Sequence, residues 1–160
     1  PWLIVGLVGS MVATFVVARF EHALARMPAI AFFVPGLVYL ADAIGTQSEA
    51  VAVRGLSLSR ASLGHLLGNE LRTGLLIGSV LALLAFPMVW LALGELRLAS
   101  AVALALGGAS VLASMLGLML PWLLARFGTD PAYGSGPLAT IVQDVLSLLI
   151  YFASVSLIVL

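Results

Sequence analysis

The sequence predicts an all-α integral membrane protein with five membrane-spanning helices. Hydrophobic residues make up 62% of the 160 residues and charged residues only 9%, against roughly 25% charged residues in ordinary soluble domains. A soluble fold of this length has too little interior to bury so much apolar side chain. The apolar residues also fall into runs of about 20, the length that a helix needs to cross a bilayer. We therefore expect residues 1–160 to form one transmembrane domain, with no soluble domain among them.

Five apolar runs follow one another along the chain. The first is free of charge, and a polar hinge between Arg19 and Arg26 separates it from the second. The second run contains Asp42 and Glu49, and it is followed by the longest polar connection, expected over residues 54–72. A tight turn at residues 95–97 separates the third run from the fourth, and a Gly- and Pro-containing loop precedes the fifth. The expected spans are residues 1–18, 27–53, 73–94, 98–125 and 137–160.

An odd number of spans places the two termini on opposite sides of the membrane. Arginine and lysine are enriched in cytoplasmic loops. With a cytoplasmic N-terminus, four arginines lie on the inner side, namely Arg54, Arg60, Arg72 and Arg126, and three on the outer side, namely Arg19, Arg26 and Arg97. We therefore expect a multi-pass protein of the cell membrane, with its N-terminus in the cytoplasm and its C-terminus outside.

The composition also excludes several classes of function. Net charge is zero and lysine is absent, so nothing supports a surface for nucleic acid. There is no cysteine, which excludes a disulfide framework, a thiolate metal site and a thiol nucleophile. No pairing of a nucleophile with a base is visible, since neither histidine lies in a catalytic setting. We expect neither an enzyme nor an organic cofactor.

The fifth run carries a polar stripe centred on the only formal charge after residue 131, Asp144. A carboxylate in the middle of a bilayer costs about 2.5 kcal/mol or more, so it must be neutralised, paired or bound to a cation. Spacings of 4, 3, 4 and 3 place the stripe on one helical face. Its hydroxyls alone could serve as hydrogen bonds between helices, but such bonds do not require a carboxylate. The stripe consists of Thr140, Asp144, Ser147, Tyr151 and Ser154.

The second run repeats the same spacing. Its stripe consists of Pro35, Tyr39, Asp42, Thr46 and Glu49. Two carboxylates and a hydroxyl thus share one face, two turns apart. Alternatively, the span ends near Ala41, and the two acids belong to a solvated helix end where Glu49 pairs with Arg54 or Arg60. Pro35 and the adjacent Gly36 are expected to bend or open the helix.

Together the two stripes favour a hard divalent cation. Carboxylates, hydroxyls, amides such as Gln47 and backbone carbonyls are oxygen donors, which suit Mg²⁺, Ca²⁺ or Mn²⁺. Mg²⁺ loses its water reluctantly, so one or two carboxylates in a wide polar cavity would be enough to hold it. Acids within the membrane could instead relay protons.

Two stretches carry a family resemblance. FFVPGLVYLADAIGTQSEAVAVRGLSL at residues 32–58 and FGTDPAYGSGPLATIVQDVLSLLIYF at residues 127–152 resemble the membrane domain of the MgtE-type magnesium transporters. The resemblance extends over the whole chain in the number and order of spans. It implies a homodimer of five-helix domains, with the cation path at the dimer centre lined by the second and fifth helices. It further implies Mg²⁺, or another divalent cation, as the transported ligand. Cytoplasmic regulatory domains, which often precede this part in the family, are not expected within these residues.

The resemblance assigns roles to particular residues. The intramembrane aspartate that binds hydrated Mg²⁺ in these proteins corresponds to Asp144, and the acid of the DPA motif corresponds to Asp130, which could also be a helix N-cap. Asp42 and Glu49 are expected as further acids of the path, with Glu49 and Asp130 nearer the cytoplasm. Hydroxyl and amide groups that would hold the water of the ion complete the metal site: Thr46, Gln47 and Thr140.

One departure from the family concerns selectivity. Family members read GGNAGTQ or similar, where this chain has ADAIGTQ at residues 41–47, so that Asp42 stands at a glycine position. Additional acids repel one another unless cations or protons lie between them. We therefore expect weaker preference for Mg²⁺, with Mn²⁺, Ca²⁺ or Co²⁺ also carried. Two alternatives remain, a proton-coupled carrier that uses the same acids and a non-transporting membrane assembly subunit.

Overall fold

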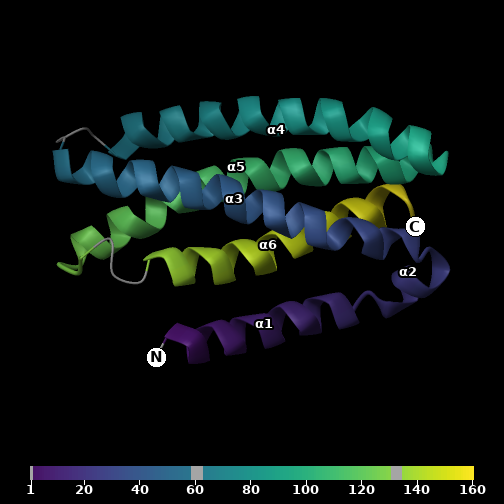
Figure 1. The fold of residues 1–160 in the computed structure, drawn as a ribbon, viewed down its shortest axis with the longest axis horizontal. Helices are drawn as coiled ribbons and strands as arrows, with labels where there is room; N and C mark the ends of the chain where they lie inside the picture. The colour runs from purple at the N-terminus through teal and green to yellow at the C-terminus, as the bar shows by residue number, and fades with distance from the viewer. Residues whose placement is uncertain (1, 59–62, 131–134) are drawn as a thin grey trace.

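The protein is a bundle of long helices that lie nearly side by side (Figure 1). The computed structural model describes residues 2–58, 63–130 and 135–160. Arg60 and the motif residues 131–134 fall outside this described part of the chain. The helices are α1 (Trp2–Ala18), α2 (Glu21–Arg26), α3 (Ala29–Leu58), α4 (Leu63–Leu93), α5 (Leu96–Arg126) and α6 (Ser135–Ile158).

Helix α5 forms the centre of the bundle, and α3, α4 and α6 pack around it. Its buried positions are mostly alanine, glycine and serine, whose small side chains allow the neighbouring backbones to approach. At Gly78 of α4, an added Cβ atom would lie 2.8 Å from the carbonyl oxygen of Gly107. At Gly117 of α5, it would lie 2.6 Å from the carbonyl oxygen of Gly45 on α3. These glycines therefore set the spacing between α5 and its neighbours.

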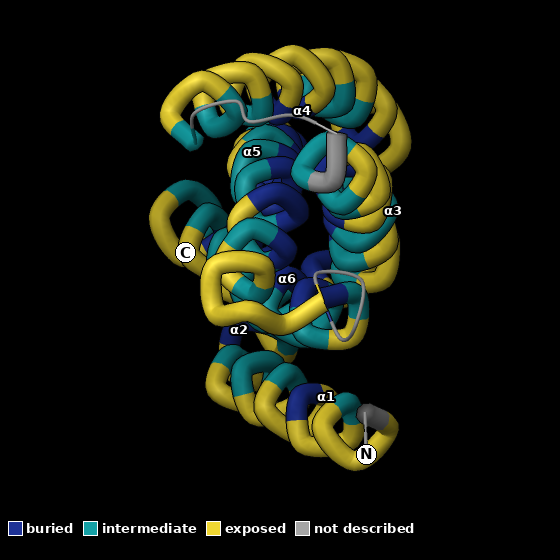
Figure 2. Tube along the Cα trace, turned by 90° about the vertical axis from the view of Figure 1, so that its left-hand side faces the viewer, coloured by how far each residue is buried: buried dark blue, intermediate teal, exposed yellow. Residues whose placement is uncertain are grey.

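Four helices, α3, α4, α5 and α6, are long and apolar enough to cross a membrane among the residues that the structure describes. The protein is thus a multi-pass membrane protein. Helix α1 is a shorter apolar helix of 17 residues and lies at the edge of the bundle, largely exposed (Figure 2). It packs mainly against α6. The fifth span, residues 1–18, therefore stays a prediction.

The polar connections are shorter than the sequence led us to expect. The hinge at residues 19–26 contains the short helix α2, and helix occupies most of residues 54–72, since α3 continues to Leu58 and α4 begins at Leu63. Helix α4 has 31 residues, about 46 Å at 1.5 Å per residue, whereas the hydrocarbon core is about 30 Å thick. Hydropathy marks where a helix leaves the hydrocarbon, and the backbone stays helical beyond that point.

Glycines with positive φ follow two of the long helices, α4 and α5. Gly94, at φ 71°, follows α4, and Gly128, at φ 73°, follows α5. Only glycine adopts this conformation at little steric cost, which makes it the usual residue after a helix C-terminus. By contrast, Pro35 lies inside an uninterrupted α3, so the expected opening of the backbone there is not observed.

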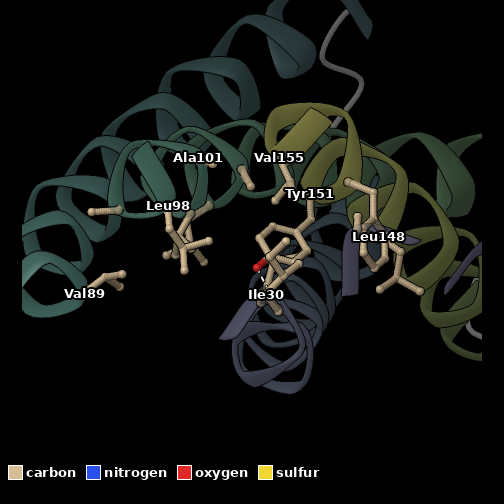
Figure 3. Close-up of a cluster of buried hydrophobic side chains, with 14 residues drawn as sticks. Ile30, Val89, Leu98, Ala101, Leu148, Tyr151 and Val155 are labelled. Carbon is tan, nitrogen blue, oxygen red and sulfur yellow. Dashed lines mark hydrogen bonds between the residues drawn. The ribbon is translucent and has the colours of Figure 1, made fainter. Parts of the chain in front are cut away.

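The largest apolar cluster joins α3, α5 and α6 at the end of the bundle where α6 finishes (Figure 3). Tyr151 of α6 is fully buried there, and its hydroxyl donates a 2.7 Å hydrogen bond to the carbonyl oxygen of Ile30. Phe152 stacks on Phe20, with ring centroids 4.4 Å apart, which ties the hinge between α1 and α3 to the bundle. Apolar side chains dominate this end, whereas Asp42, Glu49 and Thr140 lie closer to the other end of the bundle.

Candidate cation site

The two polar stripes meet at Asp42 of α3 and Thr140 of α6. The Thr140 hydroxyl donates a 2.8 Å hydrogen bond to Oδ1 of Asp42. Asp144 lies one turn further along α6 and is close enough to Asp42 for the two carboxylates to interact electrostatically. All three side chains are half-buried. Two acids and a hydroxyl from two membrane-spanning helices therefore gather at one level of the bundle.

A cavity of about 490 Å³ opens beside this cluster, between α6 and α1. Thr140 and Asp144 are among its lining residues. A water molecule takes up about 30 Å³ in the liquid, so the cavity has room for a divalent ion together with its first shell of water. This is the environment in which Mg²⁺ is usually bound, by few carboxylates and several waters.

Glu49 lies on the same face of α3, but its partner is elsewhere. Its Oε1 accepts a hydrogen bond from the hydroxyl of Ser135, the first residue of α6, and it lies over Gly136. It is therefore about two turns from Asp42, where it joins α3 to the start of α6. Glu49 and the Asp42–Thr140 pair are two separate polar contacts between these helices.

The other predicted ligands are more dispersed. Thr46 and Gln47 are exposed on α3, and the Thr46 hydroxyl bonds to carbonyl oxygens of its own helix, at 2.8 Å from Asp42 and 3.1 Å from Ala43. Asp130 is exposed after α5, and its alternative role as a helix N-cap stays a prediction, because residues 131–134 lie outside the described part of the chain. Within the described ranges, no three His, Cys, Asp or Glu side chains come together as a ready-made metal cluster in one protomer.

The remaining hydroxyls of the α6 stripe have structural partners. Ser147 donates to the carbonyl oxygen of Gln143 in its own helix, and Ser154 donates to that of Ile150 at 2.9 Å. Tyr151 is fixed on α3 by its bond to Ile30. The hydroxyls of Ser147, Tyr151 and Ser154 thus bond to backbone carbonyl groups within the bundle. Of the stripe residues, Thr140 and Asp144 line the cavity.

Gln143 is a functional candidate that the stripe did not include. Its side chain is 1% exposed, and neither amide atom has a hydrogen-bond partner among the described residues. Its amide group lies directly against Gly45 in α3, where an added Cβ atom would stand 2.1 Å from the amide nitrogen and oxygen. Buried polar groups are rarely left without partners, and this one adjoins Asp144 in the sequence. In the sequence, the only sign of this contact is Gly45, a single glycine within the second apolar run.

A second hydrogen-bonded group links α3, α4 and α5 away from the cavity. Ser114 of α5 donates a 2.6 Å hydrogen bond to Oε2 of Glu70 on α4, and Ser48 of α3 donates to the Ser114 hydroxyl at 3.2 Å. Glu70 falls within residues 54–72, which the sequence predicts as the longest polar connection. In the structure Glu70 lies within α4, and its carboxylate accepts a hydrogen bond from the completely buried Ser114.

The sequence is similar to that of known proteins over most of the chain. The sequence profile of the MgtE family, described as a divalent cation transporter, matches residues 34–154. The magnesium transporter MgtE of Bacillus subtilis is 37% identical over 155 residues, and that of Thermus thermophilus is 34% identical over 155 residues. Both alignments cover 95% of this chain but 34% of the relative, so the chain spans about a third of the length of these transporters. The chain belongs to the MgtE family of divalent cation transporters.

Proposed function

We propose that this domain carries divalent metal cations across the membrane, with Asp144 as the principal ligand. The observation that supports this most directly is the Asp42–Thr140–Asp144 cluster on two membrane-spanning helices. In the sequence, the nearest arginine to Asp42 is Arg54, twelve positions away, and the nearest to Asp144 is Arg126, eighteen positions away. Two carboxylates that lie close together within a membrane call for a cation or protons between them.

The transporting unit is a homodimer in this proposal. Tyr39 is 72% exposed, and Thr46 and Gln47 are exposed on α3 near Asp42. A polar face of this kind is unfavourable against lipid tails. A second copy that covers it would place the path between α3 and α6 of both protomers and bring four site carboxylates together. Thr46, Gln47 and Thr140 would then hold water of the ion.

Mg²⁺ is the cation that we propose first, because both relatives described above are named magnesium transporters. Asp42 at a position where the family pattern has glycine strengthens the negative field and favours ions that lose water more readily, such as Mn²⁺ or Ca²⁺. Glu49 and Asp130 lie toward the end of the bundle where α6 begins. With a cytoplasmic N-terminus, this end faces the cytoplasm, and both acids would attract cations there.

Uptake into proteoliposomes tests the proposal. The wild type should take up Mg²⁺, and Asp144→Asn should reduce uptake of every divalent ion tested by about tenfold or more, since each lost charge contact is worth about 1.4 kcal/mol or more. Glu95→Gln is the matched control, because this acid is exposed at the turn between α4 and α5. Normal uptake by Asp144→Asn would refute the role of Asp144.

The same assay separates the alternatives. Uptake that occurs only with an imposed pH gradient would identify a proton-coupled carrier. A wild type that takes up no cation, but is purified with another membrane protein, would identify an assembly subunit. For selectivity, the double variant Asp42→Gly, Ala43→Asn should shift competition toward Mg²⁺. An unchanged preference would show that Asp42 does not contact the ion.

A further inference from the structure

Helix α1 presents a distinct face to α6. Gly6, Gly9 and Ser10 follow one another at helical spacing, whereas its other faces carry large apolar side chains such as Val8, which is 58% exposed. A Cβ atom at Gly9 would lie 2.5 Å from Cγ2 of Ile141. The absence of a side chain at Gly9 therefore lets α1 approach α6 closely.

Together with Leu3, these three residues form the α1 wall of the 490 Å³ cavity, whose other wall includes Thr140 and Asp144. The Ser10 hydroxyl donates to the carbonyl oxygen of Leu7 at 2.8 Å, which leaves its oxygen lone pairs able to accept a hydrogen bond from water. Ser10 is the polar side chain that α1 contributes to this cavity. No other described helix besides α1 and α6 lines it.

The position of the cavity indicates where it leads. Both helices contribute their N-terminal halves, and both begin at the same end of the bundle (Figure 1). The cavity thus extends from that end toward the level of Asp144. A purely apolar gap at this place would be filled by a lipid tail. A carboxylate on the wall makes water the favoured filling, because an unsolvated charge in hydrocarbon is expensive.

We propose that α1 and α6 enclose a water-filled vestibule, through which a hydrated divalent cation passes between the N-terminal face and Asp144, and that Ser10 accepts hydrogen bonds from its water. The identity of the ion rests on the proposed function, but the presence of water does not. Helix α1 is then a wall of the transport path in addition to α3 and α6.

The absence of cysteine in the chain allows a direct test. In proteoliposomes, Ser10→Cys is exposed to a membrane-impermeant, water-soluble methanethiosulfonate reagent, and Val8→Cys on the far side of α1 is the control. Ser10→Cys should react faster by about tenfold or more, because the thiolate is the reactive form and a thiol in lipid stays protonated. Mg²⁺ should slow this reaction and leave the control unchanged.

Equal rates for the two cysteines would mean that a lipid tail occupies the cavity and would overturn the proposal. Labelling of Ser10→Cys that Mg²⁺ does not slow would overturn the passage of the ion. Labelling is measured without transport, so failure of Asp144→Asn to reduce uptake would refute the function and leave the vestibule standing.

A second variant blocks the vestibule without disturbing the packing. An added Cβ at Gly6 meets no atom within 4 Å, so Gly6→Leu should place its side chain in the cavity. We expect it to slow the labelling of Ser10→Cys and to reduce Mg²⁺ uptake by about tenfold, the effect of about 1.4 kcal/mol on the barrier. Val8→Leu is the control. Full uptake by a folded Gly6→Leu protein would overturn the proposed route.

Discussion

The hydrogen bond from Thr140 to Asp42 can be measured by a double-mutant cycle. Thr140→Val removes the hydroxyl and keeps the branched shape, and Asp42→Asn removes the charge and keeps the volume. The bond is 2.8 Å long, and its acceptor is a half-buried carboxylate. Hydrogen bonds to charged groups contribute about 1.5–3 kcal/mol in soluble proteins, whereas those between membrane helices average about 0.6 and reach about 1.7 kcal/mol. We expect a coupling energy of about 1–1.5 kcal/mol, between these ranges.

The assay is unfolding of the four proteins in mixed micelles with increasing sodium dodecyl sulfate, without divalent cations. Thr140→Val should lower the free energy of unfolding more in the wild type than in the Asp42→Asn protein, and the difference between these two effects is the coupling energy. Thr140→Val combined with Glu95→Gln is the control, since distant pairs add within about 0.3–0.5 kcal/mol. A coupling energy within that control range would refute the contact between the two stripes.

Three further predictions concern stability in the same assay. Gln143→Met should raise the free energy of unfolding by about 1–3 kcal/mol, because a buried amide without partners is removed at similar volume; a loss of stability would indicate a bound water. Gly117→Leu should cost about 3 kcal/mol or more by forcing α5 from α3, whereas Gly6→Leu should not. Addition of Mg²⁺ at 100 times its dissociation constant should stabilise the wild type by about 2.7 kcal/mol and chelation should reverse this, whereas Asp144→Asn should show no such effect.

Hydropathy predicted the place of the long helices well but not their ends. Four of the apolar runs correspond to the long helices α3, α4, α5 and α6, and the first corresponds to the shorter helix α1, because runs of about 20 apolar residues have the length of a helix that crosses a bilayer. Residues 54–72 were expected as a connection since they are polar, yet most of them continue α3 and α4. Polar residues outside the hydrocarbon can still be helical, and hydropathy contains no information on that.

Periodicity predicted the polar face of α6 but not what lies opposite each residue. Thr140, Asp144 and Tyr151 share the face by spacing, yet Thr140 contacts Asp42, Asp144 borders a cavity and Tyr151 is buried against Ile30. Gln143 lies one position off the stripe and is more deeply buried than Asp144. Which neighbour a position meets depends on how the helices cross, and a single sequence does not specify that.

Asp42 adds a second carboxylate to the proposed site in each protomer, and this changes how many positive charges are needed to neutralise the site. One protomer contributes two carboxylates, Asp42 and Asp144, so the proposed dimer contributes four, and a single divalent cation neutralises only half of them. The remaining charge in the membrane must be met by a second cation or by protons. With glycine in place of Asp42, as in the family pattern, two carboxylates and one divalent cation would balance. In the proposed path, Asp42 would therefore raise the number of positive charges held from two to four, and the metal competition with Asp42→Gly, Ala43→Asn examines this consequence.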